Sequence, residues 1–180
     1  FGHETNLRGK DVGLPLSELT LADRLGKLGY TSCAIGKWHL GGNPEQHPMS
    51  RGFQEFHGFL LGSRTYFSKP NKEKVTQQSL MHNREIVPED DNRYLTDWMA
   101  EKANTFIKEH SEDPFFLYVA FNAVHTPMQA PTELLQVFPD IENDRRKKLA
   151  AMTLSLDAAV GSIMDTLKEQ ELDNNTIVFF

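Results

Sequence analysis

Hydrophobic positions recur along this chain at two alternating spacings, which predict helices and strands in turn. A helix is predicted up to residue 28, because Thr20 with Asp23 forms a candidate capping box and Gly29 is a suitable stop. The helical spacing is carried by Leu21, Leu25 and Leu28. A run rich in β-formers follows directly and predicts a strand whose carboxyl end carries Lys37 and His39. A helix that leads into a strand is half of an α/β unit.

The order of helix and strand repeats in the second half of the chain. An apolar stripe with a 3.6-residue period predicts a helix over residues 94–110. The stripe consists of Leu95, Trp98, Met99, Ala103, Phe106 and Ile107. Residues 115–121 are apolar throughout, which is typical of a central strand that is covered on both faces.

Two helices and a strand are predicted after residue 130. They are a short helix over 131–138, a long helix over 142–170 and a buried strand over 176–180. The long helix should bury Leu149, Met152, Leu156, Ala159, Ile163 and Leu167. Asp157 lies near that stripe, where it either pairs with a cation or lies at the edge. Pairing is favoured, because a lone buried carboxylate is costly.

Residues 1–15 and most of residues 41–88 are predicted to be loops. Breakers such as Lys69-Pro70-Asn71 interrupt the longer stretch, and a long loop in a compact domain usually shapes a site. Three aromatic residues within it, Phe53, Phe56 and Phe59, are predicted to pack in the core. His57 is predicted to be a hydrogen-bonded structural residue rather than a ligand.

Composition narrows the class of protein. At 180 residues and 39% hydrophobic, the chain suits one domain and shows no internal repeat or linker. No apolar run approaches the ~20 residues that span a bilayer. The net charge of −6 argues against binding to a nucleic-acid backbone, and the single cysteine, Cys33, excludes an internal disulfide. The sequence therefore predicts a globular α/β domain that binds neither membrane nor nucleic acid.

Cationic side chains follow two of the predicted strands. In an extended backbone residues i and i+2 point to the same side, so Lys37 and His39 should reach one ligand while Trp38 packs the other way. Open α/β sheets place their ligands at the carboxyl ends of strands. A lysine suits an oxyanion, and a histidine can donate a hydrogen bond or move a proton. Such a pair is also typical of a solvated rim, and His125 is either a cap in a proline-rich turn or a site residue.

Longer strings around these residues resemble the sulfatase family. The string from Gly29 to Gly41 matches that family's pattern Gly-Tyr-x-Thr-x-x-x-Gly-Lys-Trp-His-Leu-Gly. The string from Pro114 to Pro131 is similar to Pro-Phe-Phe-Leu-Tyr-x-Ala-Phe-x-x-x-His-x-Pro-x-x-x-Pro, and residues 52–58 resemble the family segment Gly-Phe-x-x-Phe-x-Gly. Separate matches in the right order are far more specific than any one of them.

The resemblance implies both a fold and an activity. The fold would be an α/β alkaline-phosphatase-like sandwich, with a mostly parallel central sheet flanked by helices. The activity would be hydrolysis of sulfuric esters. In the family, residues matching Lys37 and His39 contact a formylglycine nucleophile, and the residue matching His125 binds sulfate and assists the leaving oxygen. Arg64 is a further candidate for a substrate contact, at a place where related sequences often carry a histidine.

The resemblance also implies a formylglycine and a calcium ion whose residues are not in this sequence. The family makes formylglycine from the cysteine of Cys-x-Pro-Ser-Arg, and Cys33 does not match that motif. Asp90-Asp91 lies in a polar loop and is not assigned to a metal. We therefore expect residues 1–180 to be one partial catalytic domain, with its nucleophile before Phe1, calcium ligands on both sides, and no activity as a separate polypeptide.

The family suggests a sulfated small molecule or sulfated sugar as substrate, and a periplasmic, secreted or lysosomal location. One rival is a phosphodiesterase or phosphonate hydrolase of the same superfamily, which the residue at the nucleophile position would distinguish. A second rival is a non-catalytic module that retains the fold. Loss of the missing motifs from the parent gene would favour that module.

Overall fold

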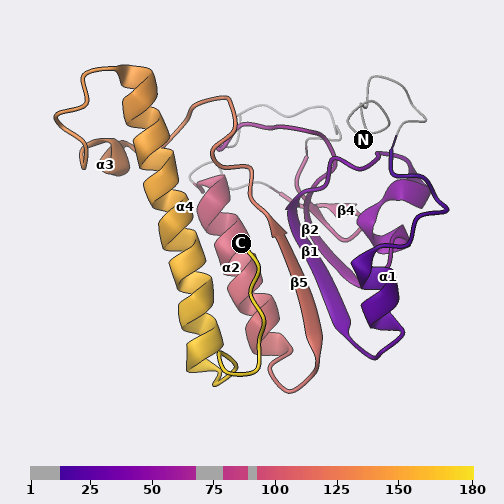
Figure 1. The fold of residues 1–180 in the computed structure, drawn as a ribbon. Coiled ribbons are helices and arrows are strands. Elements are labelled where there is room, and N and C mark those ends of the chain that lie inside the picture. The colour runs from indigo at the N-terminus through magenta and orange to yellow at the C-terminus, as the bar shows by residue number, and fades with distance from the viewer. Residues whose placement is uncertain (1–12, 68–78, 89–92) are drawn as a thin grey trace.

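The computed structural model describes residues 13–67, 79–88 and 93–180, which form one mixed sheet with helices on both faces (Figure 1). The strands are β1 (Thr31–Lys37), β2 (Glu55–Phe59), β3 (Met81–His82), β4 (Glu85–Ile86) and β5 (Phe115–Ala120), in the order β4-β3-β2-β1-β5. β1 pairs in parallel with β2 on one side and β5 on the other, whereas β3 and β4 form an antiparallel hairpin beside β2. The carboxyl ends of the three parallel strands therefore meet at one edge of the sheet.

The helices form layers on the two sides of this sheet. They are α1 (Leu21–Gly26), α2 (Leu95–Glu109), α3 (Thr132–Leu135) and α4 (Asp144–Glu169), together with the 3-10 turns η1 (Pro44–Gln46) and η2 (Pro48–Ser50). α2 packs on the sheet and α4 packs along α2, whereas α1 lies on the opposite side (Figure 1). The layered α/β architecture predicted from the sequence is confirmed.

Two hydrophobic cores fill the two faces of the sheet. The α2-side core includes Cys33, Ile35, Phe59, Trp98, Met99, Phe106 and Met152. The α1-side core consists of Ala22, Ala34, Trp38, Phe53, Phe56 and Leu60. Successive residues of β1 alternate between the cores because strand side chains point to opposite faces in turn. The prediction that Phe53, Phe56 and Phe59 are core residues is confirmed.

The start of α1 follows the predicted capping box. The hydroxyl of Thr20 accepts a hydrogen bond from the Asp23 N–H at 3.1 Å, and the Asp23 carboxylate accepts one from the Thr20 N–H at 2.8 Å. Gly29, with a φ of 85°, completes the turn into β1. Leu21 and Leu28 are exposed, and Ala22 is the buried residue of α1, because six residues make less than two helical turns.

The two long helices lie close to their predicted bounds. All six stripe residues of α2 are buried. In α4, Met152, Ala159 and Leu167 are buried as predicted, and Leu156 and Ile163 are half-buried. The prediction is wrong for Leu149, which is exposed, while the small residue Ser155 is buried. Asp157 is exposed and pairs with no cation of the described residues, so the favoured pairing is also wrong.

Two glycines allow the parallel strands to approach closely near their carboxyl ends. Gly36 of β1 and Gly58 of β2 are register partners. Gly36 has a φ of 100°, and a Cβ atom there would collide with the carbonyl oxygen of Ala120 in β5. A Cβ atom on Gly58 would collide with the carbonyl oxygen of Gly36. Side chains are therefore excluded where the three strands converge.

The stretch predicted to be irregular contains three strands, β2, β3 and β4. β2 was hidden because its flanking aromatic residues recur at spacing three, which obscures the two-residue period of a strand. β3 and β4 are only two residues long, and so carry no period at all. Of these three unpredicted strands, β2 is one of the two that pair with β1.

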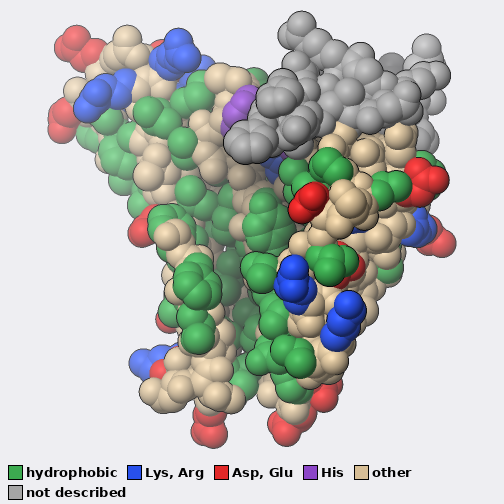
Figure 2. Space-filling view, turned by 45° about the vertical axis from the view of Figure 1, so that its right-hand side comes forward, with side chains coloured by type: hydrophobic (Ala, Val, Ile, Leu, Met, Phe, Trp, Pro, Cys, Tyr) green, Lys and Arg blue, Asp and Glu red, His purple; other side chains and the backbone are tan. Residues whose placement is uncertain are grey.

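Two other strand predictions are corrected. β5 is the outer strand of the described sheet and Tyr118 is exposed, whereas β1 is an interior strand with five consecutive buried residues. Residues 176–180 pair with no strand of this sheet, and Ile177 and Phe179 are exposed. Figure 2 shows hydrophobic side chains running down the middle of one face. An apolar run predicts that a segment is buried, but it does not predict which strand pairs with that segment.

No helix in the described part of the chain combines the length and the apolar character needed to cross a membrane. Some predictions fall outside the described residues. They are the loop over residues 1–12, the breaker Lys69-Pro70-Asn71 and the polar loop with Asp90-Asp91.

Candidate active site

Lys37 ends β1 at the edge of the sheet where the parallel strands finish. Lys37 is half-buried. No carboxylate of the described residues pairs with its ammonium group. A partly desolvated cation without a partner is unfavourable, so this position favours an anionic ligand.

His39 reaches the same edge by a route that the sequence did not predict. Its φ is 54°, so the backbone turns at this residue and is not extended. Trp38 donates its N–H to the carbonyl of Phe59 at 3.0 Å, and His39 donates to Leu60 at 3.1 Å. These bonds keep the chain beside β2 after β1 has ended. Trp38 packs in the α1-side core, as predicted.

The imidazole ring of His39 lies directly against the backbone of Gly62. A Cβ atom on Gly62 would stand 2.6 Å from Cε1 and 2.7 Å from Nε2 of the ring. These distances are well inside van der Waals contact, so only glycine leaves the ring where it is. Gly62, which has no side chain, therefore leaves the room that the His39 ring occupies.

We expect Gly62→Ala to displace the His39 ring and to lower kcat/KM of the full-length protein about 10–100-fold for a reaction that uses this ring, because small misplacements of reacting groups are costly. NMR of the His39 ring and steady-state kinetics measure the two effects. Gly161→Ala is the control, since a Cβ atom at Gly161 in α4 meets open space. An unmoved His39 resonance with full activity in Gly62→Ala would contradict the assignment.

His125 follows β5 in a turn and has an exposed side chain. Its Nδ1 lies 2.7 Å from the carbonyl oxygen of Thr126. A carbonyl can only accept, so Nδ1 carries the proton of this bond. The Nε2 atom of the ring is then the one that can exchange a proton with a ligand. The structure thus shows His125 as a hydrogen-bonded turn residue, and its role as a site residue stays a prediction.

Tyr66 fixes the turn that carries His125. Its hydroxyl lies 2.7 Å from the carbonyl oxygen of Asn122 and 2.9 Å from that of His125, and its ring is buried. The N–H of Tyr66 donates to Oε1 of Gln129 at 2.9 Å, and the Asn122 amide donates to the carbonyl of Arg64 at 3.1 Å. Residues 64–66 and 122–129 therefore form one hydrogen-bonded unit.

The electrostatics connect the three candidate residues. Burial, and then the positive charges of Lys37 and His125, lower the pKa of His39 below its usual value. His39 is thus neutral near pH 7, and it lies within electrostatic reach of both other residues. Positive charges on these residues repel one another at this edge of the sheet. A bound anion would relieve that repulsion, so the edge favours an anionic ligand.

Arg64 is buried, and its guanidinium lies over the Phe59 ring at 5.8 Å from the centroid. Its Nε donates to the carbonyl of Thr65 at 3.3 Å. These contacts stabilise the segment next to the His125 turn. A contact of Arg64 with substrate stays a prediction, as do the catalytic roles of Lys37, His39 and His125.

The described residues do not fit a calcium ion. Calcium takes six to eight oxygen ligands. The described group of three metal-capable side chains is Cys33, Glu55 and His57, which offers a thiol and an imidazole beside one carboxylate. Cys33 is also unsuited to be the nucleophile, because it is fully buried and burial raises the pKa of its thiol.

Sequence reasoning missed Gly62 and Tyr66. Neither has a spacing or a charge that marks it, since one acts through the absence of a side chain and the other through a hydroxyl that reaches a distant turn. Tyr66 is two residues from Arg64, which the sequence did single out. The sequence offered only one indication that Gly62 and Tyr66 belong to the site, which is that they follow the string over residues 52–58.

Two curated relatives show what the chain is similar to. It is 36% identical over 172 residues to arylsulfatase J of Mus musculus, a match that covers 93% of this chain and 29% of that protein. It is 32% identical over 177 residues to N-acetylgalactosamine-6-sulfatase of Mus musculus, covering 93% and 33%. The chain thus spans about a third of the length of these relatives.

A solved structure agrees with this likeness. The structure described as Ps i-CgsB in complex with k-i-k-neocarrahexaose matches with a TM-score of 0.85 and 35% identity, over 94% of this chain and 40% of that chain. The fold is therefore the alkaline-phosphatase-like α/β fold predicted from the sequence. The family model described as Sulfatase matches residues 1–180, and the chain belongs to the sulfatase family.

Proposed function

We propose that the protein hydrolyses sulfate esters, and that Lys37, His39 and His125 hold the sulfate group at the carboxyl edge of the sheet. One observation carries the proposal: His39 lies within electrostatic reach of both other residues, at an edge where no described carboxylate pairs with Lys37. Membership of the sulfatase family supports the class of reaction.

Each of the three residues has a distinct task in this proposal. Lys37 neutralises the non-bridging oxygens, where negative charge is concentrated. His125, when protonated, donates its Nε2–H to the leaving oxygen of the alcohol, because its Nδ1–H is held by Thr126. His39 is kept neutral by its surroundings and accepts a hydrogen bond or a proton at the same edge. Water supplies the oxygen that the sulfate gains overall.

We propose that residues outside positions 1–180 supply the nucleophile and the calcium ligands. The family resemblance implies a formylglycine and a calcium ion, which would provide the nucleophile and further positive charge. The lack of a Cys-x-Pro-Ser-Arg motif supports this division, as does the coverage of only about a third of the relatives. The chain would then be the sulfate-binding middle part of a catalytic domain.

A sulfated sugar is the substrate class that we favour. One relative is named for N-acetylgalactosamine-6-sulfate, and the solved structure at 35% identity has an oligosaccharide bound. The turn that carries His125 and the segment with Arg64 lie next to each other, so both would face the alcohol part of the ester.

The full-length protein should be assayed against a panel of sulfated sugars, an aryl sulfate, a phosphate diester and a phosphonate. We expect release of inorganic sulfate, with the highest kcat/KM on a sulfated sugar. Faster turnover of the phosphate diester would assign the protein to the rival hydrolase class. Binding of sulfated sugars without turnover of any compound would support the non-catalytic module.

The affinity for inorganic sulfate should rise as the pH falls through the region below 6.5. The pKa of His39 is lowered in the free protein, and a bound anion would raise it, so binding takes up a proton between these two pKa values. Calorimetry in buffers of different ionisation enthalpy measures both affinity and proton uptake. His39→Asn is the matched variant, since asparagine tolerates a φ of 54°. The same pH dependence in that variant would contradict the role of His39.

A further inference from the structure

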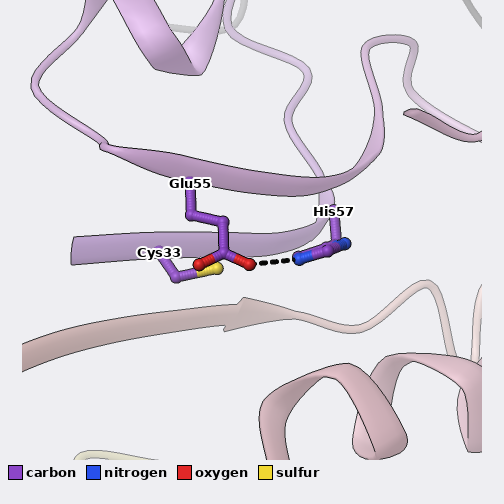
Figure 3. Close-up of side chains that lie close together, drawn as sticks. All are labelled: Cys33, Glu55 and His57. Carbon is purple, nitrogen blue, oxygen red and sulfur yellow. Dashed lines mark hydrogen bonds and ion pairs between the residues drawn. The ribbon is translucent and has the colours of Figure 1, made fainter. Parts of the chain in front are cut away.

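A second polar cluster lies inside the α2-side core, away from the edge that carries Lys37. Cys33 of β1 and Glu55 of β2 are register partners, and His57 lies two residues along β2 on the same face. Figure 3 shows the three side chains pointing toward one another from the two neighbouring strands. From Cys33 to Lys37 the strand rises four residues, or about 13 Å.

The three ligand-type atoms are close enough to share one ion. The Cys33 sulfur, a Glu55 carboxylate oxygen and a His57 ring nitrogen all lie within 4.8 Å of one another. Nε2 of His57 is 2.5 Å from Oε1 of Glu55. Bond lengths of 2.0–2.3 Å at a tetrahedral zinc ion place neighbouring ligand atoms about 3.3–3.8 Å apart. Displacements of the ligand atoms by about 1 Å, through side-chain rotation, would therefore place them at three corners of a tetrahedron.

The surroundings resemble those of a metal site more than those of a surface ion pair. Cys33 is fully buried, and the side chains of His57 and Glu55 are 9% and 22% exposed. The Trp98 ring meets the His57 ring edge-on at 6.3 Å. The His82 ring stacks on the outer side of His57 at 4.5 Å and is exposed. The cluster thus has apolar walls on the core side and an approach from solvent on the other.

We propose that Cys33, Glu55 and His57 bind a zinc-like divalent ion that ties β1 to β2, with water as the fourth ligand. A thiolate, an imidazole and a carboxylate together suit zinc and not calcium or magnesium. On binding, the thiol proton of Cys33 leaves to solvent, and the proton that Nε2 of His57 donates to Glu55 is given up while Nδ1 takes one from solvent. Nε2 and the Glu55 carboxylate then each form one metal bond in place of their hydrogen bond. The proposed ion lies outside the proposed sulfate site, and the proposal is independent of the proposed hydrolysis.

Cobalt(II) titration of the purified full-length protein tests the site. We expect saturable binding of one ion per site with a thiolate-to-cobalt charge-transfer band in the near ultraviolet and tetrahedral bands in the visible. Zinc should displace the cobalt. Cys33→Ser should remove the charge-transfer band, and both Glu55→Gln and His57→Gln should weaken binding at least about 100-fold.

His110→Gln is the matched control, because His110 acts electrostatically on Glu55 but does not belong to the cluster. It should bind cobalt as the unchanged protein does. Circular dichroism and thermal unfolding establish that each variant is folded, and zinc should raise the melting temperature of the unchanged protein but not of Glu55→Gln. Absence of saturable binding, or a thiolate band that survives Cys33→Ser, would overturn the proposal and leave only an ion pair.

Discussion

Lys37→Met should lower kcat/KM of the full-length protein for a sulfate ester by about 10²–10³-fold, without destabilising the fold. Methionine has nearly the length of lysine and no charge, so it removes the group that would neutralise the non-bridging oxygens. Loss of one such preorganised group typically costs this much. Because no described carboxylate pairs with Lys37, removing the half-buried ammonium also removes a desolvation cost. Kinetics and thermal unfolding of the same variant measure the two effects.

Lys108→Met provides the control for Lys37→Met. Lys108 lies in the last turn of α2, half-exposed, at 3.8 Å from Glu169. Its loss should change neither activity nor stability by a measurable amount, because exposed ion pairs contribute little. If Lys37→Met kept full activity, Lys37 would be a solvated residue at the rim of the sheet. If it lost activity by unfolding, the anion-binding role would have no support.

Gly36→Ala should destabilise the protein by about 3–5 kcal/mol, the largest effect on stability that we expect. Alanine at a φ of 100° is strained, and its methyl group would collide with the carbonyl of Ala120 on the neighbouring strand. The backbone on both sides is held by sheet hydrogen bonds, so relief requires β1 and β5 to separate. Urea denaturation followed by circular dichroism measures the free energy of unfolding.

Gly26→Ala is the comparison for Gly36→Ala. Gly26 is the last residue of α1, and a Cβ atom there meets nothing within 4 Å. Its replacement should change the free energy of unfolding by about 0.5–1 kcal/mol at most, in the stabilising direction expected for a helix. A loss below about 1 kcal/mol in Gly36→Ala would mean that the strands can part at little cost.

The sequence predicted the elements that carry their own periodicity. α2 and β1 were found because a helical stripe and a run of β-formers each repeat several times within the element. β2 was missed because five residues flanked by aromatics at spacing three contain no clear period. The place of β5 at the edge was also beyond the pattern, because the order of strands depends on contacts between distant segments.

The candidate site was predicted in part, for a related reason. Lys37, His39 and His125 were found because they follow strands, and strand ends are where ligands bind in such sheets. The positive φ of His39, the contact of its ring with Gly62 and the hydroxyl of Tyr66 were not predicted. Each of these depends on where a second segment lies in space, which local pattern does not encode.

The sheet order has a consequence for hydrogen exchange. β1 is bonded on both sides and buried, so its amide protons should exchange only when the whole domain opens. Among the described residues β5 is hydrogen-bonded to a strand on one side and is half-exposed, so its outer amides should exchange far sooner. Lys37 thus stands on the slowest-exchanging strand, and His125 follows one of the faster. The edge that carries both residues can therefore open locally on the β5 side, which displaces His125, while β1 keeps Lys37 in place.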